Sequence, residues 1–226
     1  RSYSVTGVQT CALPIWVTDG QPPDREQPNI SFNQVIANLE IAVGEGNPGA
    51  IALRHQGAEG SGIFDCTIDA TGGFAGIHGG IGSGGSSAGV TVIGGRFGLD
   101  FSGGYAGGTQ PTPCLTGFTL RGQTEAAIRS TSRQAVVASG LRIEADACAG
   151  PLILVGAKPS ANSGALCLVD SEIVFGGAAL DRPERVVVSS PAVTYLDNVY
   201  VRNATRVVVD PEAGNQIGRA SCRERV

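Results

Sequence analysis

The sequence has little that would tie it to nucleic acid or to a membrane. Its 16 lysine and arginine residues are fewer than its 20 acidic residues, and the net charge is −4. The basic residues form no cluster of the kind that binds a phosphate backbone, so we expect no nucleic-acid partner. No apolar run approaches the roughly 20 residues of a membrane-spanning helix, so we expect no membrane association either.

Residues that could hold a metal are also sparse. The six cysteines include no pair with the short spacing of zinc ligands, and two lone histidines, His55 and His78, make no metal site. We therefore expect no metal and no other cofactor. Cys66 and Cys167 lie in apolar, strand-like runs. Free cysteine packs there as a small hydrophobe, and a disulfide is the alternative.

The two ends of the chain resemble translated sequencing adapter rather than evolved protein. The matching runs are residues 4–15 (SVTGVQTCALPI) and 217–226 (IGRASCRERV). On this resemblance, the chain between them is expected to be an internal piece of a longer gene. The expected organisation is an adapter-derived, disordered stretch, a leader, a folded part and a second adapter-derived stretch, at 1–16, 17–28, 29–215 and 216–226.

The folded part nearly lacks helical periodicity, and its short apolar alternations are separated by glycine, serine, asparagine and aspartate, which favours an all-β protein. One four-residue phrase, a small or polar residue before an alternating apolar pair, recurs roughly every 25 residues. A β-sandwich does not readily repeat one phrase so regularly. The pattern predicts a right-handed parallel β-helix of about seven coils, incomplete at both ends. The phrase begins at Asn38, Asp65, Gly89, Gly117, Gly140, Asp170 and Asn198.

Each copy of the phrase should contribute a bend and two core residues. Its first residue is glycine, asparagine or aspartate, types that tolerate positive φ at a tight bend between strands. Its apolar pair should point into the bore, because alternate residues of a strand share a face. Two inward stacks are predicted, namely Leu39, Cys66, Val90, Phe118, Leu141, Ser171 and Val199, and Ile41, Ile68, Val92, Leu120, Ile143, Ile173 and Val201.

Three further phrases resemble the pectate lyase superfamily, and more narrowly its branch of family 55 glycoside hydrolases and related β-helix proteins. They are residues 47–53 (NPGAIAL), 97–104 (FGLDFSGG) and 122–129 (GQTEAAIR). The resemblance implies a pectin lyase-like solenoid in a secreted or cell-surface protein that acts on polysaccharide. In the glucanase branch the cleft lies between two tandem helices, and this chain resembles part of the first. The active site would then lie largely outside this piece.

Acidic residues are the first candidates for such chemistry. Glycoside hydrolysis needs a general acid and a second carboxylate, about 5–9.5 Å apart, and the resemblance implies for a lyase a base with Ca²⁺ held by carboxylates. Asp65 and Asp69 flank one strand, but Asp65 occupies a predicted bend. Asp100 stands between Leu99 and Phe101 on an alternating strand, so it should point outward, where a solvated surface position is the simpler interpretation.

Four more residues complete the candidate substrate-binding set. Glu125 and Arg129 lie four apart, and a local ion pair or a ladder between coils is the simpler interpretation for them. His78 superficially matches the Gly-His-Gly element of polygalacturonases, but residue 77 is isoleucine and no carboxylate pair precedes it, so a loop-facing histidine is expected. Tyr105, in the loop 103–113, is placed to stack on a sugar ring. No catalytic residue is assigned.

Two functions fit these observations. The first is a fragment of an extracellular polysaccharide-acting protein, of glycoside hydrolase or polysaccharide lyase type. The alternative is a non-catalytic β-helix, either a glycan-binding module or a surface or tail-fibre shaft. Convergence of Asp100, Tyr105, Glu125 and Arg129 near His78 would favour a binding site, whereas dispersion around the coil would favour the shaft.

Overall fold

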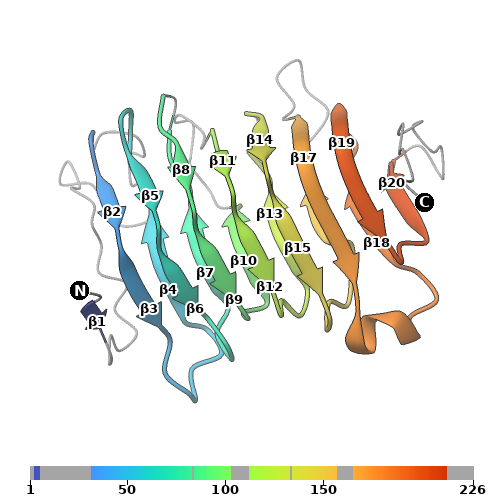
Figure 1. The fold of residues 1–226 in the computed structure, drawn as a ribbon, viewed down its shortest axis with the longest axis horizontal. Helices are drawn as coiled ribbons and strands as arrows, with labels where there is room; N and C mark the ends of the chain where they lie inside the picture. Colours follow the sequence, from blue (N-terminus) through green and yellow to red (C-terminus); the bar gives the residue numbers. More distant parts are fainter. Residues whose placement is uncertain are drawn as a thin grey trace.

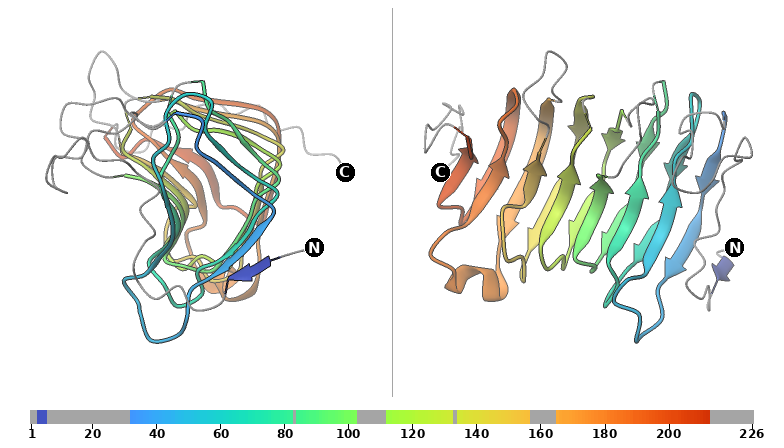
Figure 2. Two further views of the ribbon diagram at one scale, coloured as in Figure 1. Left: turned by 90° about the vertical axis from the view of Figure 1, so that its left-hand side faces the viewer. Right: turned by 180° about the vertical axis from the view of Figure 1, so that it is seen from behind.

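The protein is a right-handed parallel β-solenoid of about six turns. Its coils stack along one axis (Figure 1), and they superimpose when the molecule is seen from its end (Figure 2). The predicted all-β class and architecture are confirmed. About seven coils were expected, and the second sheet has seven strands, one from each coil, joined by about six turns. The structure, a computed structural model, describes residues 3–5, 32–82, 84–102, 112–132, 134–156 and 165–212.

Two parallel sheets enclose the interior. The second sheet has one strand per coil: β4 (Ile51–His55), β7 (Ala75–Gly79), β10 (Phe97–Phe101), β13 (Ala126–Ser130), β16 (Ile153–Val155), β18 (Val186–Ser189) and β20 (Arg206–Val209). The first sheet takes two strands from most coils. Before the bend these are β2 (Val35–Ala37), β5 (Gly62–Phe64), β8 (Ser87–Ala88), β11 (Cys114–Thr116) and β14 (Val136–Ser139). After the bend they are β3 (Leu39–Ala42), β6 (Thr67–Asp69), β9 (Thr91–Ile93), β12 (Thr119–Arg121) and β15 (Arg142–Ala145).

Two long strands, β17 (Leu166–Phe175) and β19 (Thr194–Arg202), run through the bend and join both rows into one sheet. The bend itself is built as predicted, because all seven phrase-initial residues have positive φ. The values run from 50° at Asp65 and Asp170 to 66° at Gly89 and Gly140. Asparagine and aspartate fill the positions that glycine does not, since their side chains bond locally or to the next coil. Asn198 Nδ2 donates to Asp170 Oδ1 in this way.

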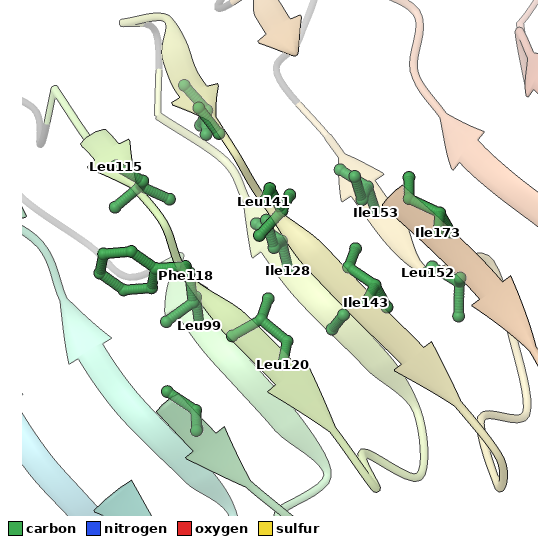
Figure 3. Packing of buried hydrophobic residues seen from close by; sticks show 14 of the residues in the cluster. Leu99, Leu115, Phe118, Leu120, Ile128, Leu141, Ile143, Leu152, Ile153 and Ile173 are labelled. Carbon is green, nitrogen blue, oxygen red and sulfur yellow. The ribbon is translucent and has the colours of Figure 1, made fainter. Parts of the chain in front are cut away.

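The apolar pairs of the phrase fill the bore. Phe118, Leu120, Leu141 and Ile143 are each at most 1% exposed and belong to one continuous cluster, part of which is drawn in Figure 3. Both predicted inward stacks are thus confirmed. In the first and last rungs the same positions are only partly buried, as at Leu39, Ile41 and Val201, because a neighbouring coil covers them on one side only.

The outermost strand lies in the stretch that we expected to be disordered. Residues Tyr3–Val5 form β1, which pairs in parallel with β3, so that Tyr3 aligns with Leu39 and Val5 with Ile41. Disorder is therefore not observed for these three residues. The edge of β3 presents unpaired N–H and C=O groups, and an extended segment of any origin satisfies them.

Cysteines and connections add little to the fold. Cys66 and Cys148 are buried and Cys167 is partly buried; they are free, as is the exposed Cys114. Cys114 aligns with Val137 on the next coil, and Val137 aligns with Cys167 on the coil after that. The two cysteines are therefore separated by two strand spacings of about 4.8 Å, which is beyond the reach of a disulfide.

A short 3-10 helix, η2 (Gly177–Asp181), follows β17. Among the described residues no helix is long and apolar enough to cross a membrane.

Candidate functional site

Three of the predicted site residues lie in one row on the outer face of the second sheet. His78 on β7 aligns with Asp100 on β10, and Asp100 aligns with Arg129 on β13. Arg54 on β4 continues the row, since it aligns with His78. Parallel, in-register stacking places equivalent residues of successive coils about 4.8 Å apart. Side chains 29 residues apart in sequence are thereby brought into direct contact.

Asp100 and Arg129 form a bidentate ion pair. The Nε atom of Arg129 donates to Oδ1 at 2.9 Å, and Nη2 donates to Oδ2 at 2.7 Å. The backbone N–H of Ser102 donates to Oδ1 at 3.0 Å, and the Ser102 hydroxyl donates to the same oxygen. Asp100 is 0% exposed. The expectation of a solvated Asp100 is therefore wrong, because the side chain does point away from the bore but the next coil supplies its counter-ion.

The environment of Asp100 determines its protonation state. Burial alone raises the pKa of this carboxyl, but the hydrogen bonds from Arg129 and Ser102, with the charge of Arg129, outweigh burial and leave the pKa below its usual value. Asp100 is therefore ionised at neutral pH. A residue of this kind anchors a guanidinium, and it does not serve as the general acid of a hydrolase, which needs a raised pKa.

His78 lies beside this pair. Its Nε2 atom is 3.8 Å from Asp100 Oδ2, which is longer than a hydrogen bond, and its Nδ1 atom is buried with no hydrogen-bond partner among the described residues. Burial lowers the pKa of His78; Asp100 opposes this effect, and Arg54 and Arg129 add to it. The ring is therefore neutral at neutral pH. His78 belongs to strand β7, in the same row as Asp100.

An aromatic pair supports the guanidinium groups. The Cζ atom of Arg129 lies 3.9 Å from the centre of the Phe97 ring, and Phe97 meets Phe74 edge to face at 5.4 Å. Arg96 lies over the same two rings, at 5.3 Å from Phe74 and 5.9 Å from Phe97. Phe97 belongs to a small apolar cluster with Ala75 and Ala126, separate from the cluster in the bore. Such stacking holds planar cations in fixed orientations.

Glu125 joins the site through Arg96. Its Oε1 atom accepts a hydrogen bond from Arg96 Nε at 2.5 Å, so the expected local pair with Arg129 is not formed. The alternative interpretation, a ladder between coils, is confirmed. Its cause is the coil register: the backbone N–H of Glu125 bonds to the carbonyl of Arg96, which places both residues at the same point of successive coils. We call Phe74, His78, Arg96, Phe97, Asp100, Glu125 and Arg129 the outer patch.

Sequence reasoning missed Phe74, Arg96 and Phe97. The signal that could have found them is the alignment of successive coils, in which Phe97 aligns with Ala75 and Ala126. In that alignment Arg96 and Glu125 occupy equivalent positions, directly before strands β10 and β13. Tyr105, the residue expected to stack on a sugar ring, lies outside the described residues.

The outer patch offers exposed polar groups around a fixed centre. Arg96 and Glu125 are well exposed and Arg129 and His78 partly so, whereas Asp100 and Phe97 are buried beneath them. Two guanidinium groups donate hydrogen bonds, a carboxylate accepts them, and the partly buried Phe74 ring lies alongside. Within the described residues, no three His, Cys, Asp or Glu side chains come together as a metal site.

Comparison with known proteins gives no match. No family model matches the chain, and no curated protein or solved structure matches it either.

Proposed function

We propose that this chain is part of a polysaccharide-acting protein and that the outer patch binds the polymer. The proposal depends on one observation, the convergence of Asp100, Arg129, His78 and Glu125 on one face of the second sheet. In that arrangement the buried ion pair fixes Arg129, and Arg96 with Glu125 presents donors and acceptors to solvent. Dispersion of these residues around the coil would have favoured a structural shaft.

The chemistry of the patch suits the hydroxyl groups of a sugar. Sugar hydroxyls both donate and accept hydrogen bonds, and charged planar groups make the strongest and most directional of these bonds. The second sheet is long in the direction of the solenoid axis, with equivalent positions about 4.8 Å apart. A linear polymer lying along that axis would meet a similar backbone geometry at each rung.

Binding is favoured over catalysis for the described residues. Asp100 is buried, ionised and bound to Arg129, and Glu125 is bound to Arg96. Neither carboxylate is arranged as a proton donor with a second carboxylate across a scissile bond. Hydrolysis or elimination, if the whole protein performs it, is assigned to residues outside this set.

Three further elements belong to the same proposal. The pectate lyase-like phrases 47–53, 97–104 and 122–129 each lead into or include a strand of the second sheet, namely β4, β10 and β13. We propose a secreted or cell-surface location, where a protein encounters polysaccharides.

We also propose that the adapter-like ends are not native. Genomic reads that span both junctions and still encode these residues would disprove this.

The test is binding of the full chain to a panel of soluble polysaccharides, with Arg96→Ala as the test variant and Arg142→Ala as its control. Both arginine side chains are 50% exposed and paired with glutamate, but Arg142 lies on the first sheet. We expect Arg96→Ala to weaken binding about tenfold or more, since it removes charged donors and frees Glu125. The control should bind as the wild type does.

The outcomes separate the alternatives. No binding to any polysaccharide, or equal binding by both variants, would contradict the proposed site. Release of sugar or formation of an unsaturated uronate by this chain would contradict the assignment of catalysis to residues elsewhere.

A further inference from the structure

A second feature lies inside the solenoid and is independent of the outer patch. It is a cavity of about 20 Å³ in the bore, beside the turn that joins β7 to β8. Its wall is mostly aliphatic and aromatic, with Ile63, Ile77, Leu99, Leu115 and Phe118 among the lining residues. Two polar side chains, His55 and Ser87, also line it.

The cavity lies beside a small polar residue in one inward row. In that row, Ser87 aligns with Leu115 of the next coil, and its Oγ atom is bonded to the backbone N–H of Ile63 in the coil before. Elsewhere in the row the inward residues are Ile36, Ala138 and Leu168. The space beside the short Ser87 side chain is not filled by its larger neighbours.

His55, which lines the cavity, has an unsatisfied acceptor. The residue is 1% exposed, and its Nε2 atom lies 3.2 Å from the backbone carbonyl of Gln34. A carbonyl oxygen only accepts, so the proton of the ring is on Nε2 and the lone pair is on Nδ1. Nδ1 is buried and has no hydrogen-bond partner in the part of the chain that the structure describes. A buried polar atom in this state is costly unless a water or another ligand satisfies it.

Ser87 supplies a matching donor. Its Oγ atom accepts a hydrogen bond from the backbone N–H of Ile63 at 3.0 Å, and its own proton has no acceptor among the described residues. Ser171 has the same role on β17, in the coil before the last, accepting from the backbone N–H of Leu141 at 3.2 Å. Unlike Ser87, it also donates, to the carbonyl of Val169 at 2.9 Å. The hydroxyl that lines the cavity is therefore the incompletely bonded one.

We propose that this cavity is an internal binding site for a single water molecule, which donates to His55 Nδ1 and accepts from the Ser87 hydroxyl. A cavity of about 10–15 Å³ measured in this way is enough for one water, and a larger ligand does not fit. A metal ion is disfavoured, because neither carboxylate nor thiolate lines the site. The bound water would complete the hydrogen bonding of both side chains inside an otherwise apolar wall.

The direct test is a high-resolution crystal structure of the full chain, determined with and without xenon pressure. Xenon enters dry apolar cavities, whereas a hydrogen-bonded water excludes it. We expect one ordered water within hydrogen-bond distance of His55 Nδ1 and Ser87 Oγ, and no xenon at the site. An empty cavity or a xenon peak would overturn the proposal.

A solution measurement keeps the proposal testable without crystals. A long-lived internal water gives nuclear Overhauser effects between water and the ring protons of His55. Ser87→Val removes the hydroxyl and fills the space, so the effect should disappear. Ser130→Val is the control, because Ser130 is equally buried but does not line the cavity. Absence of the effect in the wild type, or its persistence in Ser87→Val, would overturn the proposal.

Discussion

The bore of the solenoid and the outer patch both contain fully buried side chains, but they are stabilised by opposite means. In the bore, aliphatic residues such as Leu120 and Ile143 stack in rows, and each additional coil covers the one before it. In the outer patch, the buried residue at the centre is charged: Asp100 forms an ion pair with Arg129. The guanidinium group of Arg129 in turn stacks on the Phe97 ring. The comparison teaches that one coil register builds a nonspecific core on the inside and a specific constellation on the outside.

The largest expected effect concerns the charge at the centre of the outer patch. Arg129→Met should destabilise the protein by about 3–5 kcal/mol, because it leaves the Asp100 carboxylate buried without its counter-ion. Denaturant unfolding measures this change. The double variant Asp100→Asn with Arg129→Met should regain most of the loss, and a single variant as stable as the wild type would refute the difference drawn between the two regions.

A comparable loss, by a different mechanism, is expected in the bore. Leu120→Ala should cost about 2–5 kcal/mol through lost burial and the cavity left behind. The neighbouring Thr119 is directed outward on the same strand, and Thr119→Ala should change stability by about 0.5 kcal/mol or less. Equal effects of the two variants in urea unfolding would argue against the inward assignment.

Acidification should lower the free energy of unfolding in two stages, first through His55 and His78 and then through Asp100. The pKa values of His55 and His78 are lowered mainly by burial, so the unfolded chain binds protons that the folded chain does not. Their contribution is intact above about pH 6.5 and decreases as the pH falls, by at most about 1.4 kcal/mol per histidine for each pH unit. Asp100, with its lowered pKa, loses its contribution only below about pH 3.9.

Unfolding free energies measured across this pH range test the assignment. His55→Phe should make the decline below about pH 6.5 shallower. A protein whose stability rises on acidification through that range would contradict the burial of neutral histidines.

The smallest effect sharpens the contrast between a buried and an exposed ion pair. Arg142 bonds to Glu144 at 2.7 Å and to Glu172 at 3.1 Å on the open face of the first sheet. Arg142→Met should nevertheless cost about 0–1 kcal/mol, since water competes for exposed charges. A loss as large as that of Arg129→Met would mean that burial does not distinguish the two pairs.

Periodicity made the fold predictable from the sequence, and its limits explain what was missed. A repeated phrase reports the inside of the coil, because the same aliphatic contacts recur at Leu120, Leu141 and their equivalents. Its first residue also reported the bend, since positive φ restricts the choice to glycine, asparagine and aspartate. The outer face carries no such repetition.

The contacts of the outer patch depend on register between coils, which the phrase alone does not fix. Asp100 was recognised as outward-pointing, but its burial required knowing that Arg129 lies directly beside it. Glu125 was matched with Arg129 by sequence distance, whereas its partner Arg96 precedes it by 29 residues. Alignment of one strand with the next would have given both pairs.

The most direct test of the outer patch as a fixed binding surface is an NMR titration of the Asp100 carboxyl carbon. We predict that the midpoint of its titration lies below the usual value for aspartate, as for a carboxylate held ionised by Arg129. A titration midpoint above about 3.9, the usual value for aspartate, would contradict this account and would indicate a proton donor instead.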